Sequence, residues 1–146
     1  MRDREQSIGR WISILYRIGQ LYIGSELEQY QIGKGQHAFL CALYQRNGIR
    51  QGELASMLSM DKGTVTHALI KLEQAGYIVR QRDQRDRRIN LVYLTDKAKN
   101  IEELLFDVLA SWTETLADGL TEEERSQTLT MLRRMAENAT TVLAQR

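Results

Sequence analysis

The chain has 146 residues, of which 42% are hydrophobic and 27% charged, so it can bury a core and is too apolar to be a disordered protein. No apolar run approaches the roughly 18 residues that span a bilayer, and the start, MRDREQ, lacks the layout of a signal peptide, so we expect a cytoplasmic protein with no membrane partner. One cysteine and two histidines exclude a disulfide framework, and a metal cluster would need carboxylates to complete it, so no metal or cofactor is expected.

The net charge of +1 hides an uneven distribution along the chain. Lys and Arg outnumber Asp and Glu by five to four in residues 1–45 and by nine to five in residues 46–94, whereas residues 95–146 carry six basic and ten acidic side chains. A polyanion binds where positive charge is concentrated. The middle third is therefore the candidate contact for nucleic acid, with an ordinary solvated surface as the alternative.

A long helix is predicted over residues 5–29, where apolar residues recur at helical spacing but cover more than half of the circumference. One stripe contains Ile8, Ile12, Leu15 and Tyr22, and a second contains Trp11, Ile14, Ile18 and Leu21. A helix of this kind has two surfaces to bury. We expect one stripe to face the core of the chain and the other a second subunit, while a fully internal helix is the alternative.

A helix-turn-helix unit is predicted in the middle of the chain. After a loop over residues 30–35, a short helix with Phe39, Leu40 and Leu43 is expected to end at Asn47-Gly48. A helix over residues 51–58, a turn over residues 59–61 and a longer helix that stops at Gly76 follow. This spacing is typical of units whose second helix enters the major groove of DNA.

The outward face of that second helix is the candidate DNA-reading surface, because Val65, Leu69 and Leu72 must face inward to hold the helix on the domain. Hydroxyls and imidazole can hydrogen-bond base edges or phosphates, lysines neutralise phosphate, and glycine allows a close approach. A solvated helix face is the alternative. The candidate residues are Lys62, Gly63, Thr64, Thr66, His67 and Lys71.

A β-hairpin with a charged tip is predicted from two β-branched and aromatic segments, residues 77–82 and 89–94. Its tip can enter a narrow minor groove, where the potential is most negative. Asp83 and Asp86 would each repel phosphate, so at least one should orient an arginine, and Asp86 with Arg88 is the predicted pair. A solvated turn with incidental ion pairs is the alternative. The hairpin also carries Arg80, and the candidate DNA-binding residues are Arg82, Arg85, Asp86, Arg87 and Arg88.

Two long amphipathic helices separated at Gly119 are predicted at the end of the chain. Thr95 and Thr121 are the expected N-caps, and Glu124 completes a capping box with Thr121. Heptad-like series in both helices suit packing against partner helices. The first series is Ile101, Leu105, Val108 and Trp112, and the second is Leu129, Leu132, Ala136, Ala139 and Leu143.

Several of these segments together resemble the MarR/SlyA family of bacterial and archaeal regulators. The resemblance extends over Gln51-Gly-Glu-Leu-Ala, Asp61-Lys-Gly-Thr-Val-Thr, Leu72-Glu-Gln-Ala-Gly-Tyr-Ile, Asp86-Arg-Arg and Leu94-Thr95, and the order of helices agrees across the whole chain. Two positions depart from the family pattern. Gln84 stands where the family often has proline, which suggests a more flexible wing tip, and Ala98 stands where it often has glycine, which favours helix.

The resemblance implies a mainly α (α+β) fold in a single domain of residues 1–146. A winged helix-turn-helix DNA-binding lobe would occupy residues 34–95, and residues 1–33 and 96–146 would form dimerisation helices. The implied partners are a second copy of the chain and double-stranded DNA with a pseudo-palindromic site. Arg88 would then reach the minor groove, and Asp86 would steady the wing.

Members of this family commonly sense small aromatic or phenolic molecules, or oxidants, in a crevice between the dimer frame and the DNA-binding lobe. The residues that border this crevice by resemblance are Trp11, Leu15, Tyr16, His37 and Tyr44, with core packing as the alternative for each. Cys41 and His37 lie four residues apart and could share half of a metal site or an activated thiol. An isolated cysteine among apolar neighbours is more typical of a small buried side chain.

We therefore predict a homodimeric, sequence-specific transcriptional repressor whose affinity for DNA responds to a small aromatic effector. An enzyme is not expected, because the chain has no catalytic triad pattern, phosphate-cradling glycine loop or paired carboxylates. The alternatives are a winged-helix module for protein contacts or non-specific DNA binding, and a redox sensor that acts through Cys41.

Overall fold

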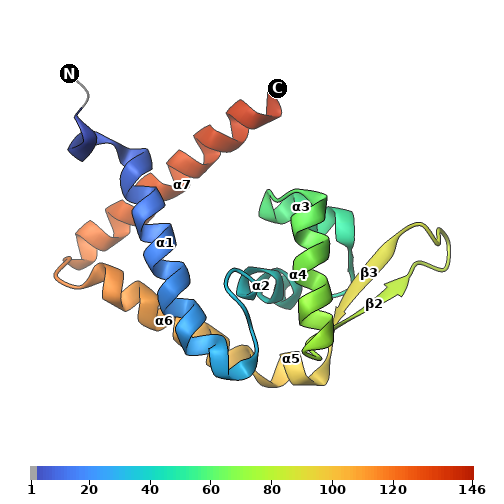
Figure 1. Cartoon of the computed structure of the whole chain (residues 1–146). Coiled ribbons are helices and arrows are strands. Elements are labelled where there is room, and N and C mark those ends of the chain that lie inside the picture. Colours follow the sequence, from blue (N-terminus) through green and yellow to red (C-terminus); the bar gives the residue numbers. More distant parts are fainter. Residues whose placement is uncertain (1–2) are drawn as a thin grey trace. The chain divides into compact units, whose positions relative to one another are not determined.

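The computed structural model describes residues 3–146 and is mainly helical, with one small antiparallel sheet (Figure 1). The chain divides into two compact units, Met1–Trp112 and Thr113–Arg146. None of the described helices is long and apolar enough to cross a membrane. The elements in chain order are the 3-10 helix η1 (Arg4–Gln6), α1 (Ile8–Leu27), the 3-10 helix η2 (Glu28–Tyr30), α2 (His37–Gln45), β1 (Ile49–Arg50), α3 (Gln51–Leu58), α4 (Lys62–Gln74), β2 (Ile78–Arg82), β3 (Asn90–Leu94), α5 (Asp96–Asn100), α6 (Glu102–Ala117) and α7 (Glu122–Ala144).

The predicted helix-turn-helix is confirmed as α3, a three-residue turn and α4. Ser59 ends α3 in the left-handed conformation, with φ of 52°, and its N–H donates back to the last turn of the helix. Asp61 then begins α4 as its N-cap, because its Oδ1 accepts a hydrogen bond from the Thr64 N–H at 2.8 Å. The same Thr64 bonds hold the pKa of the Asp61 carboxyl below its ordinary value.

The predicted hairpin is also confirmed, and the structure adds a third strand that we did not predict. The strand order is β1-β3-β2, and both pairings are antiparallel. Ile78 lies opposite Leu94 and Arg82 opposite Asn90, so β2 and β3 pair along their whole length. β1 has only two residues and pairs Ile49 with Val92, which joins the start of α3 to the sheet.

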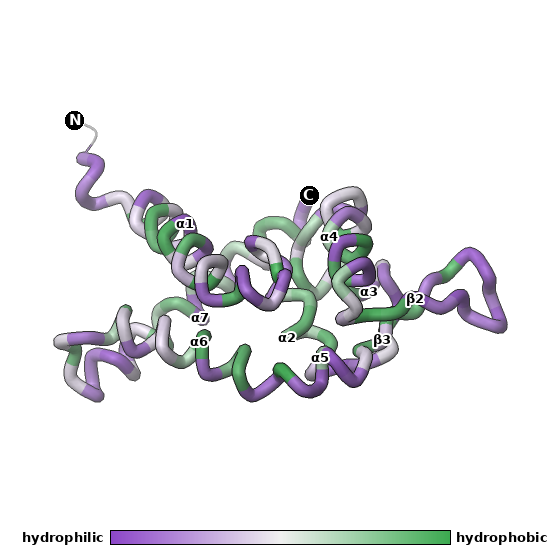
Figure 2. Tube along the Cα trace, turned by 60° about the horizontal axis from the view of Figure 1, so that its bottom comes forward, coloured by the Kyte–Doolittle hydropathy of each residue, from purple (hydrophilic) through white to green (hydrophobic). Residues whose placement is uncertain are grey.

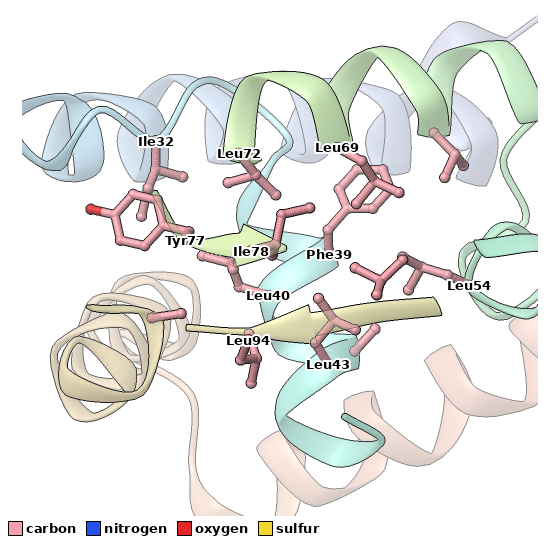
Figure 3. Packing of buried hydrophobic residues seen from close by; sticks show 14 of the residues in the cluster. Ile32, Phe39, Leu40, Leu43, Leu54, Leu69, Leu72, Tyr77, Ile78 and Leu94 are labelled. Atoms are coloured by element: carbon pink, nitrogen blue, oxygen red, sulfur yellow. The ribbon is translucent and has the colours of Figure 1, made fainter. Parts of the chain in front are cut away.

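A hydrophobic core packs the helix-turn-helix on α2 and the sheet. Figure 3 shows Leu69 and Leu72 of α4 pointing toward Phe39 of α2 and Ile78 of β2. Each of the four is at most 2% exposed. Burying a side chain of this size stabilises the folded state by about 1.5–3 kcal/mol. The orientation of α4 is therefore set by its inward residues, which leaves the opposite face free.

The C-terminal end of α4 is tied to two other parts of the same unit. Gly76 follows the helix with φ of +84°, a conformation that a side chain would disfavour. The Lys97 ammonium donates to the carbonyl of Ala75 and lies 4.5 Å from the centre of the Tyr77 ring. The Tyr77 hydroxyl in turn donates to the carbonyl of Tyr30, just after α1. These bonds hold the end of α4 against both α5 and the segment that follows α1.

We predicted that one of the two apolar stripes of α1 packs on the core, and this is wrong because most residues of both stripes are exposed. The residues of α1 that are buried are Gly19, Ile23 and Leu27, all in its second half. Tyr22 is half-buried and stacks on Trp112 of α6, with the ring centres 5.3 Å apart. The stripe residues that stay exposed are Ile8, Trp11, Ile12, Leu15, Ile18 and Leu21.

The helix predicted to begin at Thr95 is two helices, because Ile101 departs from helical backbone angles between α5 and α6. Thr95 is confirmed as the N-cap of α5. The first heptad-like series packs on the core of its own chain: Leu105 is fully buried, and Ile101, Val108 and Trp112 lie half-buried against the cluster. Gly19 lets α6 approach α1, since a Cβ atom there would lie 3.0 Å from Trp112 Nε1.

In the second unit, Gly119 and Thr121 define the start of α7 as predicted. Gly119 has φ of +80°, and the predicted capping box is present. Thr121 Oγ1 accepts from the Glu124 N–H at 3.1 Å, and Glu124 Oε1 accepts from the Thr121 N–H at 2.9 Å. No residue of α7 is buried. Its exposed large apolar side chains are Leu129, Met131, Leu132, Val142 and Leu143.

Candidate nucleic-acid interface

Five of the six predicted DNA-reading residues of α4 are exposed to solvent. These are Lys62, Gly63, Thr64, His67 and Lys71, while Thr66 is half-buried. A Cβ atom at Gly63 would have only the Asp61 carboxylate as a neighbour, at 3.3 Å, so the start of the helix is open to a ligand backbone. Gly63 and His67 share the outward face of the helix, while Lys62 and Lys71 lie nine residues apart and flank that face on opposite sides, toward the wing and toward α1.

The two threonines of this helix are engaged within the protein. Thr64 Oγ1 donates to Asp61 Oδ2 at 2.8 Å, which completes the N-cap. Thr66 Oγ1 donates to the Lys62 carbonyl at 2.8 Å and accepts from Gln51 Nε2 at 2.9 Å. The Thr66 hydroxyl has one proton, which is already donated to the Lys62 carbonyl. The bond that it accepts from Gln51 holds α3 and α4 together in the free chain. The structure thus shows both hydroxyls in positioning roles that sequence reasoning did not predict.

The hairpin forms a wing whose arginines are exposed. Figure 2 shows strongly hydrophilic residues around the β2–β3 connection. Arg82, Arg85 and Arg87 are exposed there, and the side chain of Arg88 is 90% exposed. The turn is closed by the Asp83 N–H, which donates to the Ile89 carbonyl at 2.8 Å. The wing therefore carries its positive charge into solvent and not against the core.

The predicted pairing of Asp86 with Arg88 is confirmed. Asp86 Oδ1 accepts from the Arg88 N–H at 3.1 Å and from Nε at 3.0 Å, and Oδ2 accepts from Nη2 at 3.0 Å. These bonds lower the pKa of Asp86 and raise the pKa of Arg88. Two parallel bonds fix the plane of the guanidinium as well as its position. Asp83 has a different role, because its Oδ1 accepts only from the Arg85 N–H, at 2.8 Å.

Arg80 joins the wing to α4, which we did not predict. Its Nη2 lies 3.1 Å from Glu73 Oε1, and its Nε donates to Glu73 Oε2 at 3.4 Å. The Arg80 side chain is 21% exposed, so this arginine is committed to the pair. The cross-strand geometry that brings Arg80 over α4 depends on tertiary packing, and the sequence contains no local signal for it.

A groove of about 530 Å³ lies between α3, α4 and the wing. Lys62 lines it from α4, Arg88 from the wing, and Arg50 from β1. Arg50 was missed because it lies outside both the predicted helix face and the hairpin. Glu53, which lies 3.9 Å from the Arg50 Nε, is the one acidic side chain in the lining, so the three cations leave the groove with an excess of positive charge that favours an anion.

The five predicted effector-site residues are not all brought together. Leu15, Tyr16 and His37 line one cavity of about 280 Å³, which Trp112 also borders. Burial lowers the pKa of His37. Trp11 lies elsewhere, with its Nε1 donating to the Glu5 carbonyl at 3.0 Å, and the Tyr44 hydroxyl donates to the Ala98 carbonyl.

A neighbouring cavity of about 680 Å³ reaches α4 itself. It shares Tyr16 of α1 with the smaller cavity and is also lined by Lys34, His67 and Lys71. Aromatic, imidazole and ammonium groups thus surround a space between α1 and α4. Sequence reasoning could not find this contact, because the face of α1 that turns toward α4 is set by packing.

Cys41 is half-buried and packs against the core, and burial raises the pKa of its thiol. A reactive cysteine needs the opposite shift, since the thiolate is the nucleophile. In residues 3–146, no group of three or more His, Cys, Asp or Glu side chains is arranged to hold a metal ion.

A helix-turn-helix followed by a basic hairpin that packs on the second helix defines a winged helix-turn-helix protein. The family model for the MarR family matches residues 32–89. The chain is 31% identical to the uncharacterized HTH-type transcriptional regulator YybA from Bacillus subtilis over 138 residues, which are 94% of this chain and 89% of that protein. The chain belongs to the MarR family, and it is a transcriptional regulator and not an enzyme.

Solved structures agree with this assignment. A MarR transcriptional regulator from Methanosarcina mazei Go1 is 42% identical, with a TM-score of 0.89 over 92% of this chain and 97% of that one. A MarR family transcriptional regulator from Listeria monocytogenes, solved in complex with 26mer DNA, is 25% identical, with a TM-score of 0.77 over 94% of this chain and 89% of that one.

Proposed function

We propose that the chain is a homodimeric, sequence-specific repressor that binds a pseudo-palindromic site in double-stranded DNA. The observation that carries this proposal is the exposed Arg88, which Asp86 holds in one orientation beside the free face of α4. A charged side chain that is already held in one orientation and is exposed loses little conformational entropy when it binds a ligand. The DNA complex of the Listeria regulator supports the choice of ligand.

The lobe of residues 34–95 divides the work between two elements. His67 would read base edges in the major groove, where a lone imidazole can donate or accept. Arg88 would enter the adjacent minor groove, which attracts arginine when it is narrow. Phosphate contacts would come from Lys62, Lys71, Arg82, Arg85 and Arg87. Thr64 and Thr66 would position the helix.

Residues 1–33 and 96–146 would form the dimerisation frame. Seven large apolar or aromatic side chains of α1 and five of α7 are exposed in the single chain. Apolar surface on this scale marks an interaction site, and a second copy would cover it symmetrically. Leu132→Glu should therefore yield a monomer in sedimentation analysis, whereas Asn138→Glu, on another face of α7, should stay dimeric. If Leu132→Glu stayed dimeric, α7 would not be part of the dimer interface.

A small aromatic molecule would act through the two cavities that share Tyr16. A ligand there would contact α1 and α4 together, so it could favour one placement of the recognition helix over another. Tyr16→Ala should abolish the response to an aromatic acid that weakens the DNA complex. Tyr44→Phe is the matched control, because Tyr44 lines neither cavity, and it should keep the full response.

Selection from random double-stranded DNA tests the function as a whole. We expect enrichment of a two-fold motif with half-sites about one helical turn apart, bound with an affinity that falls steeply as salt rises. A reporter gene behind the selected site should be silenced by the protein. If no motif is enriched, the chain is a module for protein contacts or non-specific DNA binding.

A further inference from the structure

Four residues form an outward row on α4: Gly63, His67, Ile70 and Gln74. They are spaced by four, three and four positions, so at about 100° per residue they share one face of the helix. All four are exposed, and Ile70 exposes 37% of its surface. Val65, Leu69 and Leu72 occupy the opposite face, with no exposed surface. Ile70 therefore lies on the same side as His67, one turn further along the helix.

Ile70 is out of place if this face only meets water. Isoleucine is a weaker helix former than alanine, lysine or glutamate, because its branched side chain loses rotamer freedom in a helix. The polar neighbours on either side are Lys71, which turns toward the cavity beside α1, and Glu73, which pairs with Arg80. An apolar side chain is thus flanked by charged groups and has space in front of it.

We propose that Ile70 is a specificity-determining residue that recognises the C5-methyl group of a thymine in each half-site. This inference rests on the proposed function, because it requires α4 to enter the major groove. The thymine methyl is the apolar group that an unmodified base pair displays in that groove. The isoleucine side chain has no hydrogen-bonding group, so its attractive contact with a base edge is with this methyl. Of the neighbouring side chains, His67 is polar, and Thr66 is half-buried with its hydroxyl bonded to Gln51 of α3 and to the Lys62 carbonyl.

Replacing single thymines by deoxyuridine in the selected operator removes the methyl and leaves every hydrogen-bonding group unchanged. At one thymine of each half-site, we expect the parent protein to lose about fourfold in affinity per methyl removed, as for one methyl group withdrawn from an apolar contact. Ile70→Ala should bind the thymine operator more weakly and should no longer distinguish thymine from deoxyuridine at that position. Ile70→Val, which stays branched, should retain part of the preference.

Val79→Ala is the matched control, because Val79 of β2 is a comparably exposed apolar residue, at 41%. It should show the same methyl preference as the parent. Thermal unfolding should show that Ile70→Ala is folded at the temperature of the binding assay, because the higher helix propensity of alanine offsets part of the apolar burial that is lost. A loss of affinity in this variant then reflects the interface and not the fold.

The outcomes separate this inference from the proposed function. If a motif is selected but no deoxyuridine substitution weakens binding, or if no thymine recurs in the half-site, Ile70 does not read a methyl group and the regulator assignment stands. The same holds if Ile70→Ala keeps the discrimination of the parent. If no motif is selected at all, the proposed function itself has failed.

Discussion

Replacing Asp86 by Asn sets two effects on DNA affinity against each other. The change removes a negative charge from the wing, and Coulomb attraction alone would make the variant bind phosphate more tightly. It also weakens the three hydrogen bonds that orient Arg88. Ordering a long side chain at an interface costs about 0.5–1.5 kcal/mol, and a homodimer has two such arginines. We therefore expect Asp86→Asn to bind its operator more weakly than the parent, by a factor of at least about five.

Asp83→Asn is the matched control, because it removes the same charge from the same loop without touching Arg88. Asp83 accepts only the Arg85 N–H, which an asparagine oxygen can also accept. This variant should bind as tightly as the parent or slightly more tightly. Fluorescence anisotropy with the selected operator measures all three proteins. If Asp86→Asn gains affinity as Asp83→Asn does, charge governs the wing and the orienting role of Asp86 is refuted.

Arg88→Ala gives the corresponding salt dependence. Each arginine that displaces a counterion contributes about 0.9 to the slope of log affinity against log salt, so the dimer should lose about 1.8. Between about 50 and 200 mM salt, the parent should then lose about twelvefold more affinity than the variant. Asp86→Asn keeps Arg88 and should keep the slope of the parent. Equal slopes for Arg88→Ala and the parent would exclude Arg88 from the DNA contact.

Three further predictions concern the stability of the helix-turn-helix. Thr66→Val leaves Gln51 Nε2 without its acceptor and should lower the free energy of unfolding by about 1–3 kcal/mol, whereas Thr66→Ser should restore most of it in urea denaturation. Leu69→Ala should cost about 2–5 kcal/mol, because the side chain is fully buried, and a smaller loss would mean that the core repacks. The pKa of Asp61 is depressed in the folded state, so its stabilisation is present above its ordinary value of 3.8 and lost as pH falls through the lower folded value. Asp61→Ala should thus be less stable than the parent at neutral pH, with a difference in melting temperature that fades in acid and would stay constant if the carboxylate had no such role.

The helix-turn-helix and the hairpin could be predicted because their signals are local. Asp61, Gly76 and Thr95 mark element boundaries through their own side chains or backbone preferences, and the structure uses all three in that way. The Asp86–Arg88 pair was predictable for the same reason, since its members lie two residues apart. β1 was missed because two residues are too short to show an alternating pattern.

Burial of the long helices could not be predicted from periodicity. α1 has apolar residues on most of its circumference, and contacts from α6, notably Trp112 against Gly19, decide which of them are covered. The series that begins at Ile101 looked suitable for a partner helix and packs on its own core, because a stripe of apolar residues does not record what it meets. For the same reason, the sequence could not show that Trp11 and Tyr44 lie outside the cavity that Leu15, Tyr16 and His37 line.

The Arg80–Glu73 pair ties the wing to the recognition helix, so the two elements keep a fixed position relative to each other. The distance between the base pairs reached by α4 and those reached by Arg88 is then fixed by the protein. One base pair inserted between them would displace the minor-groove contact by about 3.4 Å along the DNA and rotate it around the axis. Such an insertion should abolish binding by that half-site. Natural operators of this regulator should therefore keep the length of each half-site constant.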